Sequence, residues 1–383
     1  MPVTAQHPAL SSTEETTHKV SLCFVTEIDL DRKLGGAITN DLKTINCLKK
    51  LATVDSIYLR VQKYGSAWLA LPVFVSQIFS SISKSYQAFF CRGLFASFTM
   101  LLLRPLHRKK VVHNGLSVPF PSIEARYSKR NIVSRLVWFS MMRFLESVVT
   151  TNADFVVVAA NNYAIQLAKS GVQSSRIQLV SFFVEDEFFQ QPIKWEANER
   201  FTFCYIGGFH PYHILLPIIE GFKRLQKENP KIELCFVGDG PLRSKIENEI
   251  SRAGLAGKVR FIGRLPHSLI PTFLSNVDSL IVPTTYGIST NLLEAAAAAK
   301  AIITIKRRGD MTLEHYFKQG KEILYVEETS PDDIANAMRL VSSNPEIRNA
   351  ISIGARKIAR RYFSEKVCLG QFQELVEKIS IEN

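Results

Sequence analysis

The segment DSLIVPTTYGISTNLLEAAAAA, residues 278–299, passes from a strand pattern through a turn into a helix pattern. A short apolar run ends at Pro283, and a turn with glycine and hydroxyl side chains follows it. Residues with helical spacing then begin near Asn291. Strand, turn and helix in this order form the repeating unit of a parallel α/β sheet.

The same unit recurs along the whole chain. Six apolar runs precede the polar segment 190–200, and six follow it. Such runs, alternating with helical patterns, indicate parallel sheets covered on both faces. We therefore predict two doubly wound α/β domains. The alternative is one mixed α/β domain with an irregular half. Ligands bind beyond the carboxyl ends of such strands, which places the expected site in a cleft between the domains. The runs are 19–25, 55–61, 87–93, 109–115, 154–160, 176–182, 201–208, 231–240, 259–264, 278–284, 301–307 and 323–327.

The composition of the 383 residues is that of a globular protein, with 46% apolar and 21% charged residues. It excludes a disordered, collagenous or disulfide-scaffold protein. Six widely spaced cysteines without a CxxC pair indicate buried reduced thiols and a cytosolic protein. The polar N-terminus resembles no secretory signal, and no apolar segment reaches the roughly 20 residues of a spanning helix. We therefore expect a cytoplasmic protein.

The net charge of +12 favours anionic partners, and most of the excess lies in the first half. Residues 56–123 contain eight Lys or Arg and no Asp or Glu, interleaved with aromatic residues. This pattern favours peripheral docking on an anionic membrane surface, at the inner face of the cell membrane. The alternative is a pair of buried helices with a basic fringe. We expect no nucleic-acid partner, since no nucleic-acid module accompanies the charge.

Two glycine pairs lie at strand-to-helix turns. Gly36 precedes an amphipathic helix in the first half, and Gly207 and Gly208 end an apolar run in the second half. Glycine lets a backbone approach a ligand closely at a helix N-terminus. His210 and His213 follow the second pair, but no cysteine or carboxylate lies near them, so we expect no metal here.

The turn before the helix of residues 291–299 is the third candidate loop. Free backbone amides around Ser289 and Asn291 suit a diphosphate. Glu294 lies one turn further on and can accept two hydrogen bonds from ribose hydroxyls. The alternative is that Glu294 is simply a helix N-terminal charge favoured by the macrodipole.

The second half resembles the donor domain of GT-B glycosyltransferases of family 4, the group-1 glycosyltransferases. The loop GGFHPYH is similar to the family variant that reads Gly-Ser-Phe-x-Pro-Trp-His-Gly. The first half resembles the family more loosely, and the whole resemblance covers roughly residues 19–380. Four segments carry it in the family's order: 207–213, 237–243, 261–264 and 283–297.

This resemblance implies the GT-B fold, in which two Rossmann-like domains face a central cleft. It also implies a disordered tail at 1–18, an acceptor-binding domain at 19–190, a nucleotide-sugar-binding domain at 191–360, and a final helix at 361–383 that crosses back to the first domain.

The implied activity is retaining transfer of a sugar from a nucleoside diphosphate sugar to a polysaccharide or lipid-linked acceptor. No metal or further cofactor is expected. The alternative is a catalytically inactive GT-B protein that acts as a binding or scaffold subunit.

The resemblance assigns roles to individual positions. Glu294 holds the ribose, Arg264 and Leu265 lie against the base, and Gly207 and Gly208 face the phosphates. Gly36 approaches the phosphates from the other domain. The diphosphate is cradled by Gly287, Ile288, Ser289, Thr290, Asn291 and Leu292.

Departures from the family pattern also fall in the site. Tyr286 stands where the family has a glutamate that contacts the transferred sugar. Gly208 and His213 stand where many members have Arg and Lys, so two cations beside the leaving diphosphate are lost. We hypothesise that Lys306, Arg307 and Arg308, at the end of the next strand, compensate for these cations. We also hypothesise that His113 contacts the acceptor or the sugar; the alternative for His113 is a purely local hydrogen bond.

Overall fold

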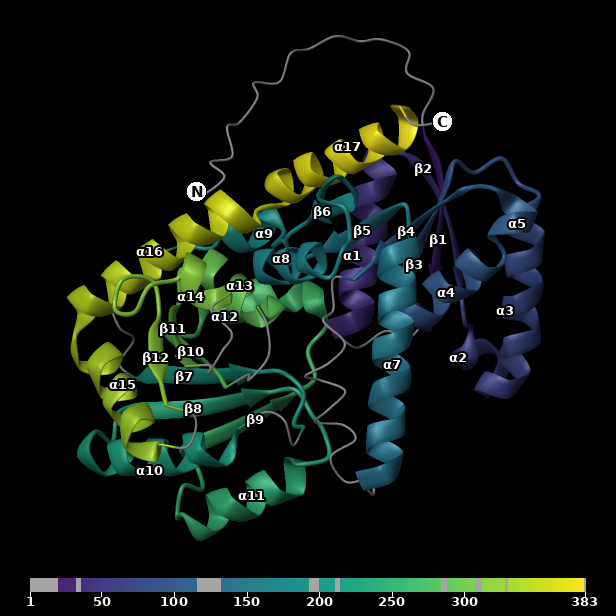
Figure 1. The fold of residues 1–383 in the computed structure, drawn as a ribbon. Coiled ribbons are helices and arrows are strands. Elements are labelled where there is room, and N and C mark those ends of the chain that lie inside the picture. Colours follow the sequence, from purple (N-terminus) through teal and green to yellow (C-terminus); the bar gives the residue numbers. More distant parts are fainter. Residues whose placement is uncertain are drawn as a thin grey trace.

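The computed structural model describes residues 20–31, 36–115, 132–192, 200–210, 214–283, 288–306, 312–327 and 330–381. These residues form two six-stranded sheets in which all neighbouring strands are parallel, with helices on both faces of each (Figure 1). The predicted tail, 1–18, lies outside the described residues.

The first sheet has the strand order β2-β1-β3-β4-β5-β6. The central strands are buried on both faces, as the apolar run in β1 requires. The strands are β1 (Ser21–Thr26), β2 (Thr53–Tyr58), β3 (Ala88–Arg92), β4 (Lys110–Asn114), β5 (Phe155–Val158) and β6 (Ile177–Leu179).

The second sheet has the order β12-β11-β10-β7-β8-β9. Each of the twelve strands overlaps one of the twelve predicted apolar runs, so the prediction of two doubly wound sheets is confirmed. The strands are β7 (Phe201–Ile206), β8 (Ile232–Val237), β9 (Val259–Gly263), β10 (Ser279–Val282), β11 (Ala301–Ile305) and β12 (Leu324–Val326).

Helices connect successive strands in both halves. In the first half they are α1 (Gly36–Leu51), α2 (Val61–Tyr64), α3 (Ala67–Ile82), α4 (Leu94–Leu102), α5 (Arg104–His107), α7 (Ile132–Asn152), α8 (Asn161–Lys169), η1 (Ser174–Arg176) and α9 (Asp186–Phe189). In the second half they are α10 (Leu216–Glu228), α11 (Arg243–Arg252), η2 (His267–Leu269), α12 (Ile270–Ser275), α13 (Thr290–Ala297), α14 (Thr312–Tyr316), α15 (Pro331–Ser343), α16 (Pro345–Phe363) and α17 (Glu365–Ile381).

The first sheet separates two helical layers. On one face, Leu48 of α1 and Phe372 of α17 pack with Phe24 and Phe90 of the sheet. On the other face, α3 and α4 cover the sheet, and Met142, Leu145 and Val149 of α7 pack against α4. In the second half, α10, α11 and α15 cover one face of the sheet, and α12, α13 and α16 cover the other.

The chain passes between the two halves twice, and the two crossings are adjacent. The first crossing leads from β6 to α9, and the second leads from α16 to α17. Val184 N donates a hydrogen bond of 2.8 Å to Phe363 O, and Val184 forms a bridge with Ser364. Cys368 and Phe372 of α17 then lie in the core of the first sheet.

All six cysteines are free and buried, as predicted. Among the described helices, none combines the length and apolarity that a membrane crossing requires.

Candidate active site

Four ionisable side chains meet between the two halves; we call them the interdomain charge cluster. They are Lys43 in α1, Glu185 just before α9, His267 in η2 and Glu294 in α13. Lys43 Nζ lies 2.7 Å from Glu185 Oε2 and 3.5 Å from Glu294 Oε1. His267 Nε2 lies 2.8 Å from Glu294 Oε1. The candidate ribose ligand is thus placed at the junction of the halves.

Burial limits the screening by water of the contact between Lys43 and Glu294. The Lys43 and Glu294 side chains are 9% and 8% exposed. The hydrogen bond to Glu294 raises the pKa of His267, although burial and the Lys43 charge act in the opposite direction. The cluster therefore combines two carboxylates with one ammonium group and an imidazole that accepts a proton more readily than usual.

The same cluster has the donor set of a metal site. One ligand atom each of Glu185, His267 and Glu294 lies within 4.8 Å of the others. The Lys43 ammonium contacts both carboxylates, however, and supplies positive charge to the oxygens that a metal ion would use. The expectation that the protein works without a metal stays a prediction.

The N-terminus of α13 presents polar groups beside the end of β7. Ser289 is the N-cap residue, and its Oγ is buried without a hydrogen-bond partner among the described residues. Asn291 Nδ2 donates to Ile206 O at 2.6 Å, while its Oδ1 is buried and has no partner in the described part of the chain. The first N–H groups of a helix also have no partner within that helix. Buried polar groups of this kind indicate a binding site for a polar ligand.

The glycines after β7 have a packing role as well. A Cβ on Gly207 would lie 2.6 Å from Tyr205 Oη, which donates to Gly208 O at 2.7 Å. A Cβ on Gly238 would lie 1.9 Å from Gly207 O, and Gly238 has a φ of 127°. The ends of β7 and β8 can therefore approach each other only without side chains.

The other predicted donor residues lie around these strand ends. Gly36 is the first residue of α1, and Ile288 and Leu265 pack against the core below α13. Thr290 is half-buried and Leu292 is buried. Arg264 and Lys306 are exposed, just beyond β9 and β11. The predicted residues Tyr286, Gly287, His213, Arg307 and Arg308 lie outside the described residues.

His113 is separated from the charge cluster. It lies in β4, is 3% exposed, and its Nδ1 is 2.7 Å from Ser97 Oγ of α4. Burial lowers the pKa of His113 to about 4, with the Arg92 charge as a smaller cause. The local hydrogen bond is therefore present, and the proposed contact of His113 with sugar or acceptor stays a prediction.

This depressed pKa predicts a pH dependence of stability. The unfolded chain protonates an imidazole near pH 6.5, whereas the folded chain leaves His113 neutral down to about pH 4. The stabilisation is thus present above pH 6.5 and is lost as the pH falls through the folded pKa. At pH 5, we expect His113 to lower the free energy of unfolding by about 2 kcal/mol relative to pH 7.5.

Denaturant unfolding at both pH values measures this loss. The variant His113→Gln keeps a polar group for Ser97 and has no proton to bind, so it should lose less stability between pH 7.5 and pH 5. An identical pH dependence in the variant and the wild type would contradict the prediction.

Sequence reasoning identified Glu294 but missed its three partners. His267 lies shortly after β9, and the rule that ligands gather beyond strand ends could have selected it. Glu185 follows the predicted run 176–182 by three residues and could have been selected by the same rule, whereas Lys43, within α1, carried no such signal. Their pairing depends on how α1 packs against the other half, which no local pattern describes.

Comparison with solved structures shows that the chain has the GT-B fold. HepE from Anabaena, crystallised in complex with UDP, superposes with a TM-score of 0.72 at 13% identity, covering 94% of this chain and 100% of HepE. Sucrose-phosphate synthase from Thermosynechococcus elongatus gives 0.76 at 15% identity, covering 95% and 100% of the two chains.

Residues 186–358 match the family model described as glycosyl transferases group 1. A lipopolysaccharide core biosynthesis glycosyltransferase from Rhizobium meliloti is 28% identical over 162 residues, which is 41% of this chain and 45% of that protein. Alignments with the first curated relatives span between 45% and 63% of those proteins. The second half of the chain thus matches group 1 glycosyl transferases, whereas the narrower family-4 assignment and the loop variant stay predictions.

Proposed function

We propose that this protein transfers a sugar from a nucleoside diphosphate sugar to an acceptor hydroxyl with retention of configuration. The observation that carries the proposal is the polar N-terminus of α13, with buried Ser289 Oγ and Asn291 Oδ1 unpaired among the described residues. These groups lie within a GT-B fold and inside the segment that matches group 1 glycosyl transferases.

In this proposal Ser289 Oγ and the first amides of α13 donate hydrogen bonds to the diphosphate. Glu294 accepts hydrogen bonds from the ribose hydroxyls. Lys43 and His267 both contact Oε1 of Glu294, which leaves Oε2 as the oxygen that we assign to the ribose. Glycine at positions 36, 207 and 208 permits close approach of the phosphates. Lys306 comes directly after β11, the strand that follows α13, and we assign it to the charge of the leaving diphosphate.

The reaction breaks the bond between the anomeric carbon and the diphosphate oxygen and forms one to the acceptor oxygen. The acceptor proton passes to the leaving diphosphate on the same face of the sugar. The protein binds and orients both substrates and stabilises the departing charge with amides and cations. It supplies no nucleophile, and we propose that it needs no metal.

For the acceptor we propose a polysaccharide or a lipid-linked glycan on the cytoplasmic side of the membrane. The similarity to the Rhizobium meliloti lipopolysaccharide core biosynthesis glycosyltransferase supports an acceptor of this class.

A panel of UDP- and GDP-sugars tests the function. We expect one donor to raise the melting temperature, because a ligand that binds only the folded form stabilises it. The same donor should be hydrolysed slowly or transferred when glycan acceptors are added. Stabilisation by a donor without any turnover would instead support the inactive binding protein, which the replacement of a family glutamate by Tyr286 favours. The absence of any effect would contradict both.

A further inference from the structure

A surface outside the active site is both apolar and basic. We call it the outer helical face, formed by the solvent-facing sides of α3, α4, α5 and α7. Ten of the sixteen exposed large apolar side chains in the described part of the chain lie on these four helices, and they are 41% to 69% exposed. They are Leu71, Val75, Phe79, Phe95, Leu102, Leu106, Leu136, Val137, Met141 and Phe144.

These side chains form stripes and are not scattered. Leu71, Val75 and Phe79 recur at intervals of four on α3, a spacing that places them on one side of a helix. Val137, Met141 and Phe144 on α7 are spaced four and three residues apart, which also places them on one side of a helix. The three helices α3, α4 and α7 belong to one layer, since α3 and α4 cover the same face of the sheet and α7 packs on α4 (Figure 1). Exposed apolar side chains that gather on neighbouring helices mark an interaction surface.

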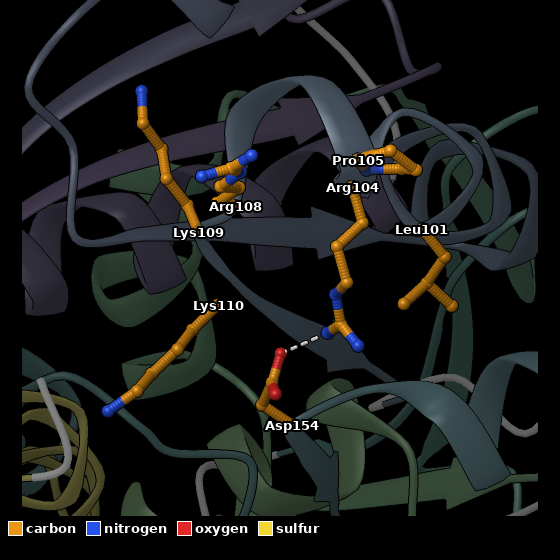
Figure 2. Close-up of a pocket in the computed structure, with 7 residues that line it drawn as sticks. All are labelled: Leu101, Arg104, Pro105, Arg108, Lys109, Lys110 and Asp154. Carbon is orange, nitrogen blue, oxygen red and sulfur yellow. Dashed lines mark hydrogen bonds and ion pairs between the residues drawn. The ribbon is translucent and has the colours of Figure 1, made fainter.

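A basic pocket lies at the edge of this layer where β4 and β5 begin. It has a volume of about 570 Å³ and is lined by Leu101, Arg104, Pro105, Arg108, Lys109, Lys110 and Asp154 (Figure 2). Four of these side chains are cationic and one is anionic. Figure 2 shows Arg104 directed at Asp154, with which it forms an ion pair.

The remaining cations of the pocket are held in different ways. Lys109 Nζ donates to Ile82 O at 2.9 Å and so ties the pocket to the end of α3. Lys110 Nζ donates to Ile379 O at 3.0 Å. Arg108 is exposed and has no side-chain hydrogen bond or ion pair with any residue that the structure describes. The pocket thus keeps a positive charge that its single carboxylate does not neutralise.

We propose that the outer helical face docks on a lipid bilayer that contains anionic phospholipid. Lipid phosphates bind at the basic pocket through Arg108 and its neighbours, while Phe79, Leu102 and Leu106 enter the headgroup region. Charge and apolarity together favour an anionic bilayer over other partners. The basic pocket attracts anionic headgroups, and burial of the adjacent apolar side chains in the headgroup region is favourable, as in other interfacial segments. A nucleic acid offers phosphates but no counterpart for the apolar stripes.

Sedimentation of the full chain with vesicles tests the proposal. We expect binding to vesicles of phosphatidylcholine with phosphatidylglycerol, weakening as salt is added, and much weaker binding to phosphatidylcholine alone. The double variant Leu102→Gln/Leu106→Gln should bind at least about tenfold more weakly. The variant Arg108→Gln should weaken binding several-fold and reduce its salt dependence.

Matched controls come from the second half. Arg252→Gln on α11 and Leu340→Gln on α15 alter side chains of similar kind that are also exposed, and they should leave vesicle binding unchanged. The proposal is overturned if the outer-face variants bind like the wild type or if anionic vesicles are not bound at low salt. It is also overturned if an RNA oligonucleotide is bound in preference to vesicles.

The proposed transferase activity is tested separately. All these variants lie away from α13, so donor hydrolysis in solution should be the same in each of them. Loss of docking with intact hydrolysis supports the docking surface, and absence of hydrolysis in the wild type bears only on the proposed function.

Discussion

Replacement of Glu294 by glutamine should lower kcat/KM for the donor sugar by about 100-fold. A hydrogen bond to a charged acceptor contributes about 1.5–3 kcal/mol, against about 0.5–1.5 kcal/mol for a neutral one. Two ribose hydroxyls would therefore lose roughly 3 kcal/mol, which corresponds to a rate factor of about 100. Steady-state kinetics with the donor found in the nucleotide-sugar panel measures the change.

Folding and catalysis must be separated in this experiment. Glutamine keeps the shape of Glu294 and can still accept a hydrogen bond from His267, so the variant should remain folded by circular dichroism. Glu249→Gln on α11 removes a carboxylate from an exposed position and serves as the control. Full activity in Glu294→Gln would remove Glu294 from the donor site.

The second large effect concerns stability. We expect Lys43→Met to lower the free energy of unfolding by about 3 kcal/mol, because removing one partner of a buried ion pair leaves uncompensated charge. Of the four side chains in the cluster, only His267 would then remain in contact with the carboxylates of Glu185 and Glu294. Chemical denaturation measures this loss.

The same helix provides a matched control. Lys50 of α1 pairs with Glu365 of α17, but its side chain is 53% exposed. Lys50→Met should therefore cost less than about 1 kcal/mol. Equal losses in the two variants would show that burial of the Lys43 pair has no special weight.

The sheets were predictable because most of their strands are buried on both faces. In β5 the four residues Phe155–Val158 are all buried, and the apolar run in the sequence is continuous. The edge strand β2 is the informative exception. It is Thr53–Tyr58, while the predicted run was 55–61, because only one of its six side chains is buried and the apolar signal is weak.

The site was only partly predictable. The turn before α13 and the glycines after β7 are local features, and the structure describes Ser289, Asn291, Gly207 and Gly208 at adjacent strand ends. The partners of Glu294 come from the other half of the chain and from the junction, so they depend on packing between elements distant in sequence. The sequence around a lysine in an amphipathic helix does not indicate which carboxylate the lysine contacts in the folded protein.

The neighbouring crossings of the chain between its halves have a mechanical consequence. Val184 and Phe363 are hydrogen-bonded at that point, so the two connections between the halves lie side by side. Any rotation of one half against the other that separates α1 from α13 would break the contact of Lys43 with Glu294. In the proposed transferase, widening of the donor site would therefore cost a buried ion pair.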